Sequence, residues 1–268
     1  MAVITISSGL CGKGKQVAKR LSEKLSYRVI SREVLLEASE HFNIPEIKLT
    51  RAIDNAPSIL DRFFYGKEKY IAYIKEAILS RLADDNVVYH GMAGHFFVQG
   101  IPHVLKVLVV SDIEDRIAEE VSQHDVTPRE ARRLIEKDDD ERQAWGYHLY
   151  GLDTRDPNLY DLTVNLKNTS LDEAVDVILQ AVKLPGFQTT DKSKSELANK
   201  ALEARLYARV VDKHPTAKVS ITDGTAHISV ETGNFLNSNT VSSIETLLAD
   251  FKNKLEVKVN VVPILEAG

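Results

Sequence analysis

The chain has 268 residues, 43% hydrophobic and 27% charged, which is enough for one large core or two ordinary ones. Its net charge of -5 comes from 34 basic and 39 acidic residues with no polybasic run, which argues against nucleic acid and anionic membranes as partners. One cysteine excludes an intramolecular disulfide and a multi-cysteine metal site. The first ten residues lack the basic and apolar regions of a signal peptide, and no apolar stretch is long enough to span a bilayer, so we expect a cytoplasmic protein.

The N-terminal segment predicts a strand, a glycine turn and a helix. Residues 3–6 are a β-branched run that ends at Ser7-Ser8-Gly9. Val17, Leu21 and Leu25 then recur at helical spacing up to about residue 26.

Further strands and helices alternate up to about residue 183. We expect helices over 70–82, from 113, over 128–140 and over 171–183, and strands over 86–90, 104–110 and 160–165. Parallel neighbours need crossover connections, and the strands are nearly continuous apolar runs that suit a sheet covered on both faces. The predicted fold class is α/β.

The composition and the hydrophobic periodicity of the sequence change after Leu184-Pro185-Gly186. The next residues are polar and without periodicity, so we place a linker over 187–197 between a domain of residues 1–186 and one of residues 198–268. The second domain should run helix, strand, strand, helix, strand, with Asp223-Gly224 as a hairpin turn. This predicts a small α+β domain of order αββαβ.

The clearest motif is G-x-x-x-x-G-K, formed by Gly9-Leu10-Cys11-Gly12-Lys13-Gly14-Lys15 between the first strand and helix. Glycines let the backbone curl so that its N–H groups and the helix N-terminus face one anion, and the lysine adds charge. The candidate nucleotide-binding residues are Gly9, Cys11, Gly12, Lys13, Gly14, Lys15 and Gln16. The alternative is a plain glycine turn whose lysines are solvated.

Two residues depart from the full phosphate-binding motif. Its lysine is normally followed by Ser or Thr, whose hydroxyl holds Mg²⁺, but Gln16 and Val17 follow here. Cys11 lies near a helix N-terminus, which can lower a thiol pKa, but a small buried residue is the simpler interpretation.

Motifs across residues 1–183 resemble the cytidylate kinase-like family of P-loop nucleoside-monophosphate kinases. Besides the loop they are Ser31-Arg32-Glu33, His90-Gly91-Met92-Ala93-Gly94, Leu105–Val110, Asp112–Arg116, Lys137-Asp138-Asp139-Asp140-Glu141-Arg142 and Tyr160–Asn165. The resemblance implies ATP with Mg²⁺, a core P-loop domain, a monophosphate-binding segment over 32–82 and a lid over about 116–156.

The resemblance also suggests roles for individual residues. The catalytic candidates are Lys15, Arg116 and Arg142, with Asp139 as the acidic companion, and the candidates on the acceptor side are Arg32, Gly91, Met92 and Gly94. Phosphoryl transfer needs positioning and cations more than a base, which suits the arginines. The alternative for the acidic run around Asp139 is a solvated helix face.

Other features put the activity in question. Met92 and Ala93 stand where the family has Arg and cytidylate kinases have Asp, which removes charge-assisted contacts to CMP. His90 and His95 flank this turn, and packing is the simpler role for each.

The second domain resembles the BON domain, mainly through its hairpin over 219–230. That resemblance implies a module that binds a ligand or a protein partner, and an oligomer is possible. Two functions follow: a nucleotide-binding phosphotransferase, or a degenerate sensor of nucleotides acting through the second domain. A purely structural scaffold would leave the loop lysines and glycines without purpose.

Overall fold

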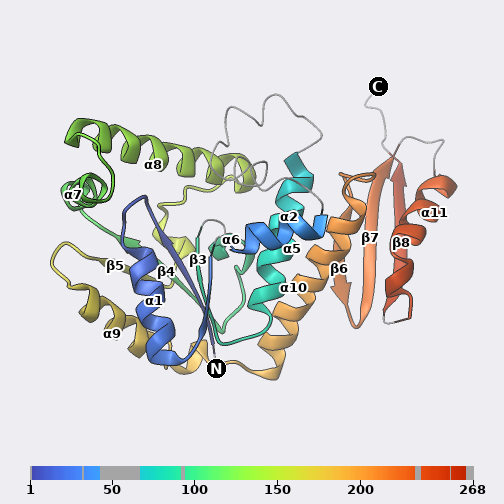
Figure 1. Ribbon diagram of the computed structural model, residues 1–268. Coiled ribbons are helices and arrows are strands. Elements are labelled where there is room, and N and C mark those ends of the chain that lie inside the picture. The colour runs from blue at the N-terminus through green and yellow to red at the C-terminus, as the bar shows by residue number, and fades with distance from the viewer. Residues whose placement is uncertain are drawn as a thin grey trace.

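Five parallel strands form the central sheet of the computed structural model (Figure 1), which describes residues 2–31, 33–42, 67–91, 94–232, 237–253 and 255–263. The order is β2 (Arg28–Ile30), β3 (Val87–His90), β1 (Val3–Ser8), β4 (Val104–Val110) and β5 (Leu162–Asn165). Each strand is followed by helical structure before the next, as parallel pairing requires. The predicted α/β class is confirmed.

Helices cover both faces of this sheet, so its apolar strands are buried on both sides. On one face α1 (Gly14–Leu25) and α9 (Leu171–Ala181) pack on β1 and β4 through Val17, Leu21 and Ile178. On the other lie α2 (Glu33–Phe42), α5 (Lys67–Leu82), α6 (Gly94–Phe97) and α10 (Asp191–Val210). The alternation of β1 sends Ile4 and Ile6 to the first face and Val3 to the second.

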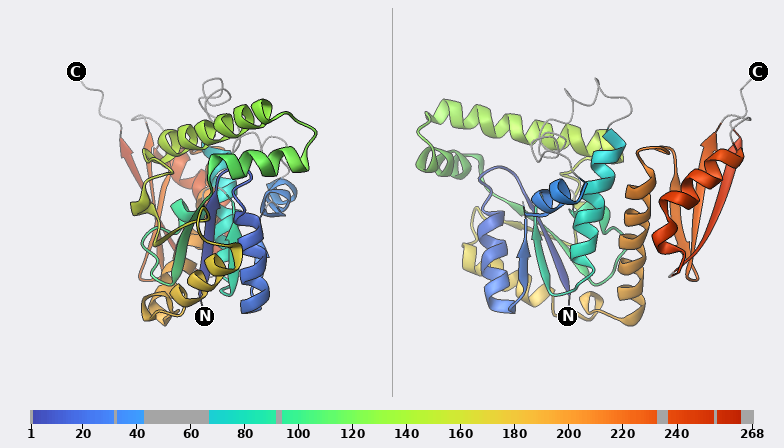
Figure 2. Two further views of the ribbon diagram at one scale, coloured as in Figure 1. Left: turned by 90° about the vertical axis from the view of Figure 1, so that its left-hand side faces the viewer. Right: turned by 45° about the vertical axis from the view of Figure 1, so that its right-hand side comes forward.

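A helical hairpin lies over the carboxyl ends of the strands (Figures 1 and 2). It consists of α7 (Ile113–Gln123), capped by Asp112, and α8 (Pro128–Tyr150), which begins with a capping box of Thr127 and Glu130. Its own small core contains Ile117, Ala131 and Ile135. A 3-10 turn, η1 (Pro157–Leu159), then leads into β5.

The C-terminal region has its own three-stranded sheet and core. Its strands are β6 (Lys218–Thr222), β7 (Thr225–Thr232) and β8 (Glu256–Pro263), and its helices are α10, α11 (Asn237–Leu247) and the short η3 (Ala249–Phe251). β6 and β7 are antiparallel and joined at Asp223-Gly224, both with positive φ, whereas β7 and β8 are parallel. The small α+β unit is therefore present.

Most of the residues expected to form the linker are helical. After η2 (Pro185–Phe187), a capping box of Thr190 and Ser193 starts α10 at Asp191, so residues 191–197 are helical. The first half of α10 packs against α5 and places Leu197 in the core beside the large sheet. Its second half places Leu206 in the core of the small sheet.

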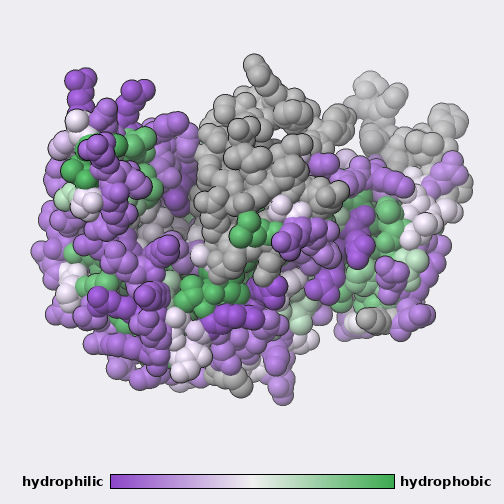
Figure 3. Space-filling model, viewed as in Figure 1, coloured by the Kyte–Doolittle hydropathy of each residue, from purple (hydrophilic) through white to green (hydrophobic). Residues whose placement is uncertain are grey.

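Other predicted elements differ in extent. The helix that begins at Pro128 runs to Tyr150 instead of ending near residue 140. The sequence did not predict β2, α2 or α6. Among the described residues no helix has the length and hydropathy that crossing a membrane requires. The face shown in Figure 3 is mostly hydrophilic outside its grey atoms, with only scattered hydrophobic patches.

Candidate functional site

The turn between β1 and α1 leads into a helix N-terminus that no side chain caps. The Gly12 amide donates to the carbonyl oxygen of Gly9 at 3.0 Å, and Lys13 has a left-handed backbone with φ 59°. No side chain caps the N-terminus of α1, and its first turn carries no acidic residue. A helix N-terminus without a side-chain cap or an acidic first turn has the N–H groups and the dipole orientation that suit an anion.

Two glycines of this turn allow close approaches that a side chain would prevent. A Cβ on Gly9 would lie 2.6 Å from Arg116 Nη2 and 2.8 Å from Asp139 Oδ1. A Cβ on Gly12 would lie 2.9 Å from the carbonyl oxygen of Gly9. The glycine pattern of the motif thus has a steric basis here.

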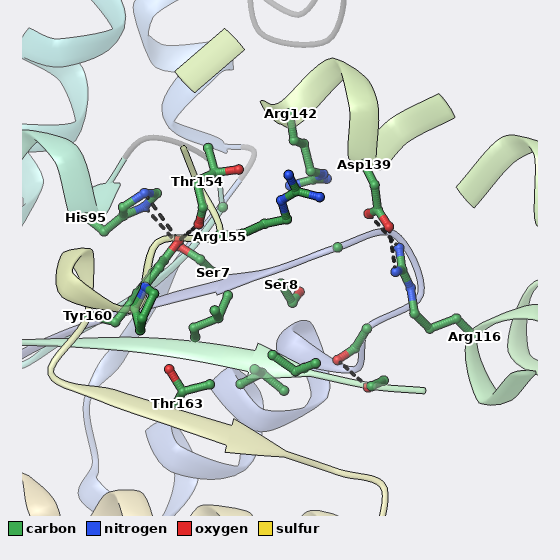
Figure 4. Close-up of a pocket in the computed structure, with 18 of the residues that line it drawn as sticks. Ser7, Ser8, His95, Arg116, Asp139, Arg142, Thr154, Arg155, Tyr160 and Thr163 are labelled. Atoms are coloured by element: carbon green, nitrogen blue, oxygen red, sulfur yellow. Dashed lines mark hydrogen bonds and ion pairs between the residues drawn. The ribbon is translucent and has the colours of Figure 1, made fainter. Parts of the chain in front are cut away.

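The helical hairpin closes on the turn through Arg116. Its guanidinium makes two hydrogen bonds of 2.8 Å to the carboxylate of Asp139, and its Nε donates to the carbonyl oxygen of Leu10 at 2.8 Å. The pair joins α7 to α8 (Figure 4) and lies against Gly9. Bidentate geometry fixes the orientation of the guanidinium.

A second carboxylate of α8 occupies a donor of the loop. Asp138 Oδ2 accepts from the Leu10 amide at 3.2 Å and from Arg142 Nε at 2.5 Å. Both donors are of the kind that hold phosphate oxygens. The carboxylate of Asp138 therefore binds the Leu10 amide and Arg142, and that of Asp139 binds Arg116. An incoming phosphate would need these same donors.

The remaining loop residues have different environments. Lys15 and Gln16 are exposed at the start of α1, and Lys13 is half-buried. Cys11 Sγ donates to Glu120 Oε2 at 2.8 Å, and burial followed by this hydrogen bond raises the pKa of the thiol to about 12. Such a thiol is not a reactive nucleophile, which favours the structural interpretation of Cys11.

A cavity of about 460 Å³ opens beside the loop at the carboxyl end of the sheet. Its lining includes three glycines and two arginines on the side of the loop and neutral polar residues on the side of β5. They are Gly9, Gly12, Gly91, Arg116 and Arg142, and Thr154, Tyr160 and Thr163. Its floor is one row of side chains across three strands, because Ser7 of β1 pairs with Leu108 of β4 and Leu108 pairs with Thr163 of β5.

His90 ends β3 beside the loop. Its Nε2 lies 3.4 Å from Ser8 Oγ, and burial, with Arg142 and Lys15 nearby, lowers its pKa to about 4. The imidazole is therefore neutral at pH 7 and adds no charge to the site. The sequence favours packing for this residue, and the hydrogen bond to Ser8 adds a polar contact.

The acceptor-side candidates are only partly placed. Gly91 lines the cavity, and Gly94 is buried against Tyr89, where a Cβ would meet the ring at 2.5 Å. Arg32 and Met92, together with Ala93 and residues 43–66 of the expected monophosphate-binding segment, lie outside the described residues. The arrangement thus gathers the loop, Arg116, Asp139 and Arg142 at one site.

The contacts of several groups at the site carry no signal in the local sequence. Ser7 and Tyr160 are hydrogen-bonded partners of His95, and Asp138 contacts a backbone amide 128 positions away. Within the described ranges, no group of three or more His, Cys, Asp or Glu side chains is placed to hold a metal ion.

The profile of the cytidylate kinase-like family matches residues 3–168. The match spans more than half of the 268 residues, so the chain belongs to the cytidylate kinase-like family. It ends before α10, so it does not cover the C-terminal region. A search of curated proteins finds no match.

One solved structure shows the same fold at low identity, and two others have lower similarity scores. An uncharacterized protein from Eubacterium ventriosum is 17% identical with a TM-score of 0.51, over 68% of this chain and 98% of that one. Shikimate kinase from Acinetobacter baumannii in complex with shikimate is 14% identical with a TM-score of 0.38, over 68% of this chain and 93% of its own. Thymidylate kinase from Candida albicans is 13% identical with a TM-score of 0.39, over 72% of this chain and 93% of its own.

Proposed function

We propose that the protein is a phosphotransferase that binds ATP at the loop of residues 9–15 and transfers its γ-phosphoryl group to a nucleotide-like acceptor. The observation that carries this proposal is the uncapped N-terminus of α1 directly opposite two arginines of the hairpin. Membership of the cytidylate kinase-like family supports it.

Each basic group has a distinct place in the proposed reaction. The loop amides and Lys15 hold the outer phosphates, while Arg116 and Arg142 neutralise charge on the transferred group from above. Gly91 and Gly94, with Arg32 and Met92, belong to the acceptor side by resemblance. Asp139 orients Arg116 through its two hydrogen bonds, which makes it a positioning residue.

Mg²⁺ would arrive with the nucleotide, because the described residues offer no dedicated cage. Gln16 is exposed and lacks the usual hydroxyl, while the two nearest carboxylates, Asp138 and Asp139, are engaged by arginines. Mg²⁺ commonly keeps several waters and binds substrate phosphates, so this arrangement suits it. When bound, the ion would neutralise phosphate charge.

A second function is a nucleotide sensor without turnover, in which α10 would transmit the signal between the two sheets. Its Leu197 belongs to the core of the P-loop domain and its Leu206 to that of the C-terminal sheet, so one rigid element connects them. Under this proposal the BON-like unit, from about residue 198, would bind a ligand or a protein partner. We also propose a cytoplasmic location, since the one cysteine and the nucleotide substrate suit that compartment.

Calorimetric titration with ATP, with and without Mg²⁺, tests the shared first step. Lys15→Ala should weaken binding at least about tenfold if the ammonium contacts phosphate. Lys19→Ala is the matched control, because Lys19 is an exposed lysine of the same helix whose ion pair is with Glu23. Equal loss in both variants would contradict the assignment of the loop.

Release of ADP from ATP with each nucleoside monophosphate then separates the two functions. Turnover on one acceptor that Lys15→Ala abolishes establishes the phosphotransferase. Binding of ATP without turnover favours the sensor. Absence of ATP binding by the unmodified protein refutes both.

A further inference from the structure

A buried polar cluster lines the cavity on the side away from the hairpin arginines. Ser7 Oγ lies 3.0 Å from His95 Nδ1, and His95 Nε2 lies 3.3 Å from the hydroxyl oxygen of Tyr160 (Figure 4). The Tyr160 hydroxyl donates to the carbonyl oxygen of Thr154 at 2.8 Å. His95 is 3% exposed and Tyr160 is 9% exposed, so water does not complete these bonds freely.

The positions of the hydrogen atoms in this cluster follow from the backbone carbonyl of Thr154 at its end. A carbonyl oxygen can only accept, so the single hydroxyl hydrogen of Tyr160 points to Thr154. Burial raises the pKa of Tyr160, and the Ser7 hydroxyl lies close enough to lower it in part, so the Tyr160 oxygen has two neighbouring donors. We assign the donor as His95 Nε2–H at 3.3 Å, since the Ser7 hydroxyl makes its 3.0 Å contact with His95 Nδ1. Burial, followed by the nearby ammonium of Lys106, lowers the pKa of His95 to about 3, so the ring carries one proton only. Nδ1 is thus an acceptor, and it takes the hydrogen of Ser7.

Ser7 consequently offers only lone pairs to the cavity. We propose that Ser7 is a specificity-determining contact of the phosphoryl acceptor and that its Oγ accepts a hydrogen bond from a neutral hydroxyl or amino group of that molecule. A phosphate or carbonyl oxygen at this point would face the Ser7 oxygen without a hydrogen between them, which is unfavourable. This inference rests on the proposed function, since it concerns the second substrate of the same site.

The charges of the cavity agree with such an orientation. Arg116 and Arg142 lie at the loop end, and the guanidinium of Arg155 is held by Asp153 at 3.1 Å. The floor row at the other end consists of Ser7, Leu108 and Thr163, none of which is charged. An acceptor therefore binds with its anionic group toward the arginines and its neutral donor group toward Ser7.

Matched nucleotides test the contact. With adenylyl imidodiphosphate bound, affinities are measured for CMP, UMP, AMP and IMP and for the 2′-deoxy form of each. A nucleotide and its 2′-deoxy form differ by one donor hydroxyl. CMP and UMP, like AMP and IMP, exchange an exocyclic amino donor for a carbonyl oxygen while the neighbouring ring nitrogen gains a hydrogen. In at least one pair the affinities should differ by about 5- to 50-fold, and the nucleotide with the hydroxyl or amino donor should bind more tightly. Ser7→Ala should reduce that difference to about twofold or less. Ser8→Ala is the matched control, because that hydroxyl faces His90 instead of His95, and it should retain the difference.

A spectroscopic measurement decides the hydrogen positions without any ligand. In ¹H–¹⁵N correlation spectra at pH 7, with His95→Gln to assign the signals, His95 should carry its proton on Nε2. Ser7→Ala should shift the Nδ1 resonance and leave the tautomer unchanged. A proton on Nδ1, or no donor-dependent pair despite binding of the ATP analogue, overturns the inference. Failure of the ATP analogue to bind refutes the proposed function instead, while the tautomer still tests the assignment of Ser7.

Discussion

Replacing Asp138 by Asn should increase the affinity for ATP. In the structure its carboxylate binds the Leu10 amide at 3.2 Å and Arg142 Nε at 2.5 Å, both of which a phosphate would use. A hydrogen bond to a charged group is worth about 1.5–3 kcal/mol, but Asp138 and Arg142 are 27% and 28% exposed, so solvent screening leaves about 1 kcal/mol. The amide keeps the shape and removes the competing charge, so the dissociation constant should fall about fivefold.

Calorimetric titration of Asp138→Asn with ATP measures this effect. Asp140→Asn is the control, because it removes the same charge from an exposed position of α8 without touching the loop. The control should bind ATP as the unmodified protein does, apart from a small effect of net charge. If Asp138→Asn binds ATP less tightly, its carboxylate assists the nucleotide instead of competing with it, and our reasoning about the hairpin is refuted.

Three further predictions concern the loop, the buried histidine and α10. Gly9→Ala should weaken ATP binding about tenfold by displacing Arg116, whereas Gly186→Ala, with open space around it, should have no effect in the same titration. Because burial lowers the pKa of His95 to about 3, the unfolded chain binds more protons below pH 6.5 and stability falls on acidification. Between pH 7 and 5 this costs about 2 kcal/mol, and urea unfolding of His95→Gln should lack that loss. Leu197→Ala, at 1% exposure, should lower the free energy of unfolding by about 2–4 kcal/mol in the same assay, and a change below about 1 kcal/mol would contradict its core position.

The parts that the sequence predicted well are those that depend on local pattern. The strand over 104–110 matches β4 because Pro102 and Ser111 bound a run that is apolar except for Lys106. The loop of residues 9–15 follows from a motif within one turn. By contrast, β2 has only three residues, Arg28–Ile30, and too short a pattern to distinguish a strand from a loop.

The contacts that define the site could not be predicted, because they join distant segments. Asp138 and Leu10 are separated by 128 positions, and nothing local in the acidic run indicates that one carboxylate reaches a backbone amide. The Ser7–His95 bond, across 88 positions, depends on α6 following β3 directly. Each histidine taken alone favoured packing, and only the structure shows its partners.

The helical structure of residues 191–197 is not evident from the sequence, for a physical reason that bears on function. A helix with one buried face shows a single apolar stripe, but α10 buries Leu197 and Ala204 against the large domain and Leu206 and Val210 against the small one. The two buried faces of α10 point in different directions, so its sequence shows no single apolar stripe. Its polar first turns therefore resemble a linker.

The same double burial means that the two domains cannot move independently. Ala204 is 2% exposed against the P-loop domain, and the carboxylate of Glu76 on α5 accepts from Arg205 Nε at 3.3 Å. A displacement of α5 must therefore carry α10 with it or open a cavity at this contact, and cavities in well-packed cores are costly. Since α10 continues into the core of the small sheet, any displacement of α5 on nucleotide binding would be transmitted to that sheet as a rigid-body shift.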